Sequence, residues 1–148
     1  MKIIKLTTEN LVSGCVTDEP APRFSFAIGD APNGTKLRSA ELCVGDHRIV
    51  TDEQLNIKYD GAPLQPFTEY RVKLTATTED GESDTAVTSF RTGRMSEPWQ
   101  AKWITDAKYK FTDKGTSPLP MLFRKRLGIA KDIVSAYLSV TAIGIFDI

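Results

Sequence analysis

The segment that most constrains the fold is residues 64–76, which read LQPFTEYRVKLTA. From Tyr70 onward, apolar side chains alternate with side chains that carry a charge or a hydroxyl. A period of two is typical of a strand in an antiparallel sheet that buries one face and exposes the other to water. At the start of this strand, Tyr70 fits a tyrosine corner, with its ring in the core and its hydroxyl hydrogen-bonded to upstream backbone. The segment therefore predicts one strand of a β-sandwich.

Residues 1–93 contain about seven short segments of this kind, and no segment has the pattern of a long amphipathic helix. Besides 70–77, the predicted strands are 2–6, 23–28, 37–44, 48–50, 56–59 and 86–91. Short strands separated by Gly, Pro, Asn and Asp are typical of an immunoglobulin-like sandwich. Residues 10–22 lack a period and are rich in Gly, Pro and Asp, which predicts an irregular crossing segment.

The pattern L-x-P-x-T-x-Y-x-V-x-L-x-A over 64–76 resembles the core signature of fibronectin type III domains. The resemblance implies an all-β protein and says little about chemistry. That family usually places a tryptophan in the sandwich centre, where this chain has Phe24 and Phe26. This departure bears on the packing of the core and leaves the predicted fold unchanged.

Charge and hydropathy argue against two classes of partner. Lys plus Arg equals Asp plus Glu at 19 each, so no net field favours nucleic acid or an anionic membrane. The Arg124–Arg126 run holds three cations, which fits a solvated strand face better than a nucleic-acid site. No apolar run approaches the ~20 residues that a membrane helix needs. The N-terminus does not resemble a signal peptide, because Lys5 interrupts its short apolar stretch.

The two cysteines, Cys15 and Cys43, are too few for a metal site. We expect two free thiols that pack as small apolar side chains. A disulfide between them stays open, because sequence spacing alone does not decide it.

No set of residues predicts catalysis, a cofactor or a metal ion in this chain. His47 is the only histidine, and it lies at a turn without an evident partner, so we expect a surface residue. The acid pairs Asp18–Glu19 and Asp52–Glu53 fit solvated turns. We therefore assign no catalytic, cofactor-binding or metal-binding residue.

The sequence changes character after Gly93, so we predict a domain boundary there, between 1–93 and 94–148. Residues 95–98 read as a linker. Three aromatic residues follow: Trp99, Trp103 and Tyr109. Two interpretations of them stay open: a platform on which sugar rings stack, and side chains that seal an interface between domains.

The segment 94–148 predicts further strands at 122–127 and 133–148, where apolar and polar residues alternate. Two or three strands cannot enclose a core. We expect a truncated second β-sandwich that packs on the first domain, pairs with another copy of the chain, or stays partly disordered. A homo-oligomer through these exposed C-terminal strands is one outcome. The chain reads as the front of a longer protein.

The chain as a whole resembles the N-terminal region of bacterial α-L-rhamnosidases. The motifs that carry the resemblance are DEPAPRFSF (18–26), YDG (59–61), LxPxTxY (64–70), DGxS (80–83), SFxTG (89–93), WxAxWI (99–104) and FRK (123–125). In that family a fibronectin-like domain precedes a second β-sandwich and an (α/α) barrel. The barrel hydrolyses terminal α-L-rhamnose with inversion, by means of two carboxylates.

The resemblance implies a non-catalytic accessory region, because no part of the barrel falls within these residues. Its partner would be the remainder of the parent enzyme, and we expect that parent to be periplasmic or secreted. Two other functions stay open: a carbohydrate-binding module, and a fibronectin type III module that binds a protein through edge strands or loops.

Overall fold

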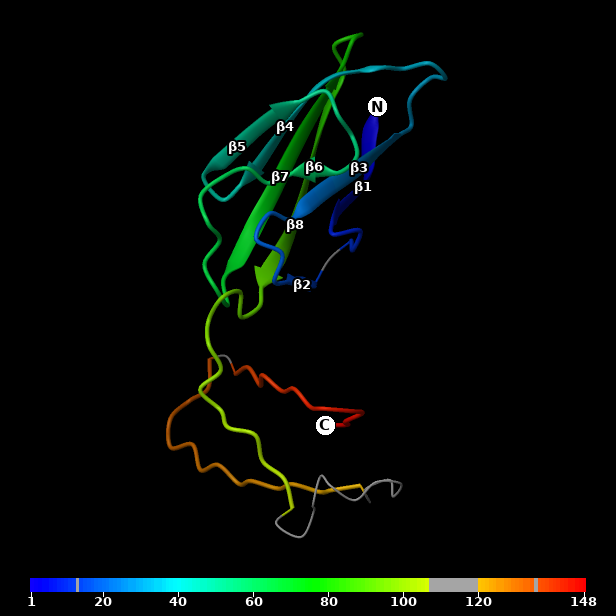
Figure 1. Ribbon diagram of the computed structural model, residues 1–148. Coiled ribbons are helices and arrows are strands. Elements are labelled where there is room, and N and C mark those ends of the chain that lie inside the picture. Colours follow the sequence, from blue (N-terminus) through cyan, green and yellow to red (C-terminus); the bar gives the residue numbers. More distant parts are fainter. Residues whose placement is uncertain (13, 107–119, 135) are drawn as a thin grey trace. The chain divides into compact units, whose positions relative to one another are not determined.

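The computed structural model describes residues 1–12, 14–106, 120–134 and 136–148, and these residues form strands but no helix (Figure 1). The chain divides into two compact units, Met1–Gln100 and Ala101–Ile148. In the described residues, no helix has the length and apolar character needed to cross a membrane.

The first unit is a β-sandwich of eight strands in two sheets. The smaller sheet has the order β1-β3-β6 and the larger sheet the order β2-β8-β7-β4-β5. Every pairing is antiparallel except that of β2 with β8. The strands are β1 Lys2–Thr8, β2 Cys15–Thr17, β3 Arg23–Gly29, β4 Leu37–Val44, β5 His47–Thr51, β6 Ile57–Lys58, β7 Glu69–Thr78 and β8 Ser83–Thr92. The predicted all-β sandwich is confirmed.

The core lies between the two sheets and follows the period of two. On β7, Val72, Leu74 and Ala76 are fully buried, and so are their counterparts on β4 in the same register. The aromatic centre comes from Phe24 on β3 and Phe90 on β8, whose ring centroids lie 5.9 Å apart. Phenylalanine thus fills the place where the fibronectin pattern has tryptophan.

The first difference from the sequence prediction is β2, which falls within the segment predicted to be irregular. Residues Cys15–Thr17 pair in parallel with Phe90–Thr92 of β8. Three residues are too few to display a period, and their partner lies far along the chain, so local pattern carries no signal for this strand. The first unit therefore has eight strands instead of about seven.

The second difference concerns the second unit. The predictions of strands at 122–127 and 133–148 are wrong for the described residues of those segments, which form no strand. An alternating pattern forms a strand only when neighbouring strands supply backbone hydrogen-bond partners. Many large apolar side chains in this unit are exposed, including Leu122, Val134, Leu138 and Ile145.

One edge of the smaller sheet is β1, and it departs from a regular strand. Its register with β3 shifts between Ile3 and Lys5, so the pairing of the two strands is irregular there. The backbone N–H of Ile3 donates to Asp84 Oδ2 at 2.7 Å. That amide therefore already has a side-chain acceptor from β8.

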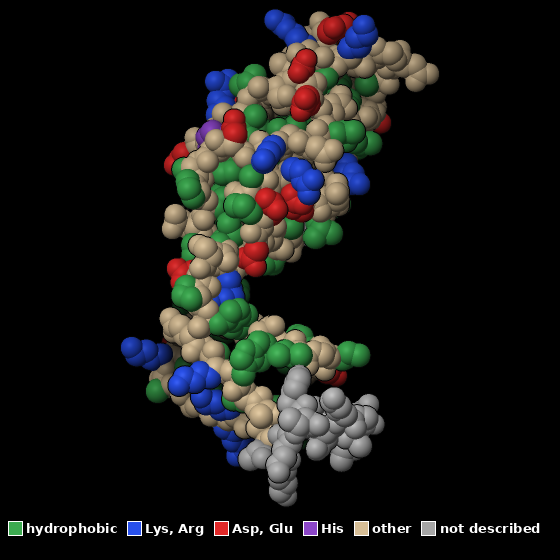
Figure 2. Space-filling view, viewed as in Figure 1, with side chains coloured by type: hydrophobic (Ala, Val, Ile, Leu, Met, Phe, Trp, Pro, Cys, Tyr) green, Lys and Arg blue, Asp and Glu red, His purple; other side chains and the backbone are tan. Residues whose placement is uncertain are grey.

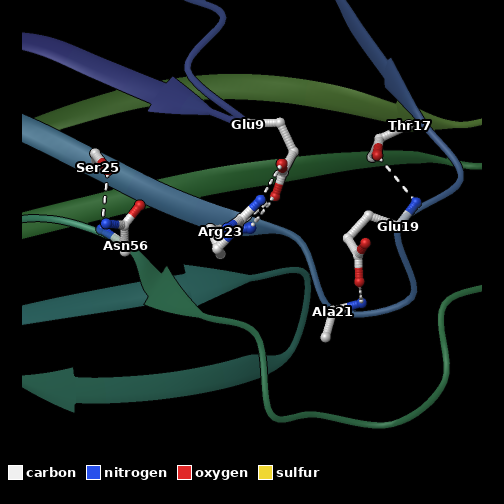
Figure 3. A network of polar contacts seen from close by, with 7 residues as sticks. All are labelled: Glu9, Thr17, Glu19, Ala21, Arg23, Ser25 and Asn56. Carbon is white, nitrogen blue, oxygen red and sulfur yellow. Dashed lines mark hydrogen bonds and ion pairs between the residues drawn. The ribbon is translucent and has the colours of Figure 1, made fainter.

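A polar network joins the end of β1 to the start of β3 (Figure 3). Glu9 Oε1 accepts the backbone N–H of Arg23 at 2.7 Å, and Glu9 Oε2 accepts Arg23 Nη2 at 3.1 Å. These bonds hold the pKa of Glu9 below its usual value, the side-chain hydrogen bond from Arg23 being the largest cause. On the face that Figure 2 shows, charges of both signs are interspersed over the first unit.

Candidate functional site

The predicted site residues that the structure describes in the first unit lie at the end of the sandwich where β8 finishes. Tyr70 is the second residue of β7, and its hydroxyl accepts the backbone N–H of Gln65 at 2.8 Å. Its ring stacks on Phe90, with centroids 5.4 Å apart and planes 18° from parallel. The side chain is half-buried, and it ties the loop before β7 to the core.

Thr92, the last residue of β8, closes the same corner from the other side. Its buried hydroxyl donates to the carbonyl of Gln65 at 2.6 Å and accepts the backbone N–H of Thr68 at 2.9 Å. The next residue, Gly93, accepts the N–H of Phe67 at 2.8 Å. The loop 65–68 is therefore bonded at several points to the end of β8.

Arg94 follows this corner and lies against two aromatic rings. Its guanidinium carbon is 4.2 Å from the centroid of Trp99 and 5.8 Å from that of Phe67. A guanidinium over an aromatic face is attracted by the ring quadrupole. Arg94 Nη2 also donates to the carbonyl of Glu97 at 2.8 Å and to that of Pro98. Its Nε is buried and has no hydrogen-bond partner among the described residues.

Asp18, predicted to be a solvated turn residue, has a defined partner here. Its Oδ1 accepts the backbone N–H of Met95 at 2.6 Å. A Cβ on Gly93 would lie 2.7 Å from that same oxygen, so only glycine fits beside the carboxylate. The two motifs that contain Asp18 and Gly93 thus meet at this corner.

The three aromatic residues predicted as a platform are not described as one group. Trp99 belongs to the first unit and is 46% exposed, and Trp103 belongs to the second unit and is 69% exposed. Tyr109 lies outside the described residues. The sugar-platform and domain-interface interpretations therefore both remain predictions.

His47, predicted to have no partner, forms a cluster with the residues that follow β6. Its Nε2 lies 2.6 Å from Asp60 Oδ1, and its ring contacts that of Tyr59 edge-on, with centroids 5.2 Å apart. The hydroxyl of Tyr59 donates to the carbonyl of Ala62 at 2.9 Å. A Cβ on Gly61 would collide with both rings, which explains the glycine of the YDG motif. Sequence reasoning missed this pairing because His47 begins β5 and Asp60 follows β6, so no local pattern connects them.

The arrangement at the corner is one of packing and hydrogen bonding. Cys15 and Cys43 are free, and burial raises the pKa of the Cys15 thiol. Over the part of the chain that the structure describes, no three metal-ligating side chains come together. Chemically, the site offers a fixed guanidinium between two rings and the partly exposed face of Trp99.

Comparisons with known proteins agree with the fold. The family model described as "Rha78A-like, N-terminal immunoglobulin domain" matches residues 3–96. Comparison with curated proteins gives no match. The chain is similar to the α-L-rhamnosidase of Streptomyces avermitilis complexed with L-rhamnose, at 23% identity and a TM-score of 0.63, covering 70% of this chain and 12% of that one.

Two further rhamnosidase structures share the fold. The α-L-rhamnosidase of Dictyoglumus thermophilum is 24% identical with a TM-score of 0.65, over 74% of this chain and 14% of that one. The enzyme of Aspergillus terreus is 19% identical with a TM-score of 0.54, over 62% and 12%. The chain thus spans only 12% to 14% of the length of these proteins.

Proposed function

Because the chain belongs to the family of Rha78A-like N-terminal immunoglobulin domains, we propose that it is a non-catalytic accessory region of a rhamnosidase-type glycoside hydrolase. In this role it acts as a spacer and a packing partner for the rest of the parent enzyme. The parent hydrolyses terminal α-L-rhamnose from glycans, and it does so with two carboxylates that lie outside this chain.

The observation that supports this proposal best is the corner at the end of β8. The chemistry of this corner is structural: a tyrosine hydroxyl, a threonine hydroxyl and an aspartate each satisfy backbone groups there. Such a corner fixes where the chain leaves the sandwich. We propose that residues 1–93 form the sandwich domain and that residues 94–148 lead into a second β-sandwich, for which the parent supplies the neighbouring strands.

The proposal is tested by an activity assay on the purified chain and on the parent enzyme. We expect the chain alone to release no nitrophenol from an aryl α-L-rhamnoside, and the parent to release it. Removal of residues 1–100 from the parent should lower its melting temperature, because packing contacts are lost. Release of nitrophenol by the chain alone would overturn the non-catalytic assignment, and a parent without a helical barrel would overturn the enzyme class.

A second candidate function, carbohydrate binding, is favoured by one observation, which is the exposure of both tryptophan rings. Aromatic faces pack on the apolar C–H face of a pyranose. This function predicts a change in tryptophan fluorescence on titration with L-rhamnose, and loss of that change in Trp99→Ala. A flat titration to millimolar sugar would leave the accessory role as the function of the chain.

A further inference from the structure

We propose that residues 94–99 form a rigid strap folded onto the end of the sandwich, with Asp18 and Arg94 as its two positioning residues. The sequence prediction was a linker over most of this segment. A rigid strap would fix the direction in which the chain leaves the accessory domain. That role rests on the proposed function, whereas the rigidity of the strap does not.

The first anchor is the loop that follows β2. Asp18 Oδ1 accepts the N–H of Met95 at 2.6 Å, and the carbonyl of Thr17 accepts the N–H of Gly93 at 3.0 Å. These bonds hold the residues on both sides of Arg94. The side chain of Met95 also packs against the hydrophobic core. The amides of Gly93 and Met95, on either side of Arg94, therefore tie the start of the strap to the sandwich.

The second anchor is the side chain of Arg94. Its Nη2 donates to the carbonyls of Glu97 and Pro98, and its backbone carbonyl accepts the N–H of Glu97 at 2.9 Å. The arginine thus bonds the start of the strap to Glu97 and Pro98 near its end. Its guanidinium lies over the ring of Trp99 in the strap and over the ring of Phe67 in the sandwich loop. Arg94 therefore joins the far end of the strap to the sandwich.

The backbone supports a fixed conformation. Met95 has a φ of +52° and Phe67 a φ of +53°, values that residues other than glycine adopt only when surrounding contacts hold them. Flexible linkers are typically rich in Gly and Ser, whereas residues 94–99 contain one serine and no glycine. The burial of Arg94 Nε and the half-exposure of Trp99 are consistent with one ring face covered by the guanidinium. Residues 94–99 accordingly move with the sandwich.

The test measures amide hydrogen exchange of Met95 in the full chain, together with acrylamide quenching of Trp99 in a Trp103→Phe background. We expect the Met95 amide to be protected in the unsubstituted chain. Asp18→Ala should accelerate its exchange by about tenfold or more, because local opening becomes easier. Arg94→Ala should increase the quenching of Trp99. Asp52→Ala and Arg38→Ala, which change exposed residues outside the strap, are the matched controls and should change neither signal.

The outcomes distinguish local loosening of the strap from unfolding of the whole sandwich, and they do not depend on the proposed function. The urea midpoint of the sandwich should stay within error in Arg94→Ala, so faster quenching without unfolding supports the strap. Exchange of Met95 at the rate of an unstructured peptide in the unsubstituted chain would overturn it. Neither signal depends on rhamnosidase activity, so a failed activity assay on the parent would contradict the proposed function and leave the strap standing.

Discussion

At the scale of single residues, the first unit depends on side chains that each satisfy one backbone group far along the chain. Tyr70 is the clearest case, because its hydroxyl accepts the N–H of Gln65 while its ring packs on Phe90. We predict that Tyr70→Phe lowers the free energy of unfolding by about 0.5–1.5 kcal/mol, since the exposed Gln65 amide exchanges the tyrosine hydroxyl for water. Urea denaturation measures this, and an unchanged midpoint would contradict the corner's role.

Glu9 gives a prediction about pH. Its pKa in the folded protein lies below the ordinary value of 4.5, chiefly because of the hydrogen bond from Arg23. A lowered folded pKa means that the stabilisation is fully present above that ordinary value and is lost as pH falls through the folded pKa. We expect Glu9→Gln to lower the urea midpoint at neutral pH and to flatten its fall under acid conditions.

The control for this experiment is Glu53→Gln, which removes an exposed carboxylate at a turn. It should keep the pH dependence of the unsubstituted chain. Equal slopes of midpoint against pH in the unsubstituted chain and in Glu9→Gln would show that the Arg23 network does not stabilise the fold. Arg23 is largely exposed, so solvent screening keeps the expected effect modest.

Part of this residue-level chemistry could be predicted from the sequence, and part could not. Tyr70 stands at the start of an alternating strand after a proline, so its place follows from local pattern. The bond from Asp18 to Met95 joins residues 77 positions apart, and the contact of His47 with Asp60 joins the start of β5 to the segment after β6. An isolated acid or histidine at a turn has no periodic signature, so only the folded backbone shows its partner.

At the scale of elements, β4 and β7 form the centre of the larger sheet and one face of each is fully buried. We predict that Leu74→Ala on β7 lowers the free energy of unfolding by about 2–5 kcal/mol, because it leaves a cavity in the core. Val87→Ala on the outer face of β8, where the side chain is 50% exposed, should cost about 0.5 kcal/mol or less. Similar losses in urea denaturation would contradict the assigned faces.

At this scale, a strand could be predicted from the sequence when it was long enough to show a period of two and when a neighbouring strand was present to pair with it. Strands of five residues or more with a period of two were found, and the range of β4 was predicted as observed. β2 was missed because three residues show no period. The predictions at 122–127 and 133–148 failed for the opposite reason: the period is present, but the described residues there have no neighbouring strand to complete it.

At the scale of the whole molecule, the two units differ in how much of their apolar side-chain surface is exposed. The first unit buries its alternating apolar residues, whereas the second leaves large apolar side chains exposed. Clustered exposed apolar surface binds hydrophobic dyes and promotes association. We predict that replacing Leu138, Ile143 and Ile145 with Ser lowers the fluorescence of bound ANS and reduces self-association in sedimentation.

The matched control replaces three scattered exposed valines of the first unit, Val16, Val50 and Val87, with Ser. Isolated surface apolar residues are ordinary in folded proteins, so this variant should bind ANS like the unsubstituted chain. An equal drop in both triple variants would contradict a distinct apolar surface in the second unit. Homo-oligomer formation through that unit stays a prediction until sedimentation decides it.

The irregular edge of β1 has a consequence for how this protein behaves at high concentration. Fibrils grow when successive chains add strands by hydrogen bonding to the unpaired backbone amides and carbonyls of an edge strand. At β1 the register with β3 shifts between Ile3 and Lys5, and the Ile3 amide already donates to Asp84. We therefore expect this edge of the smaller sheet to be a poor template for cross-β growth, because its pairing is irregular and one of its amides is already bonded to a carboxylate.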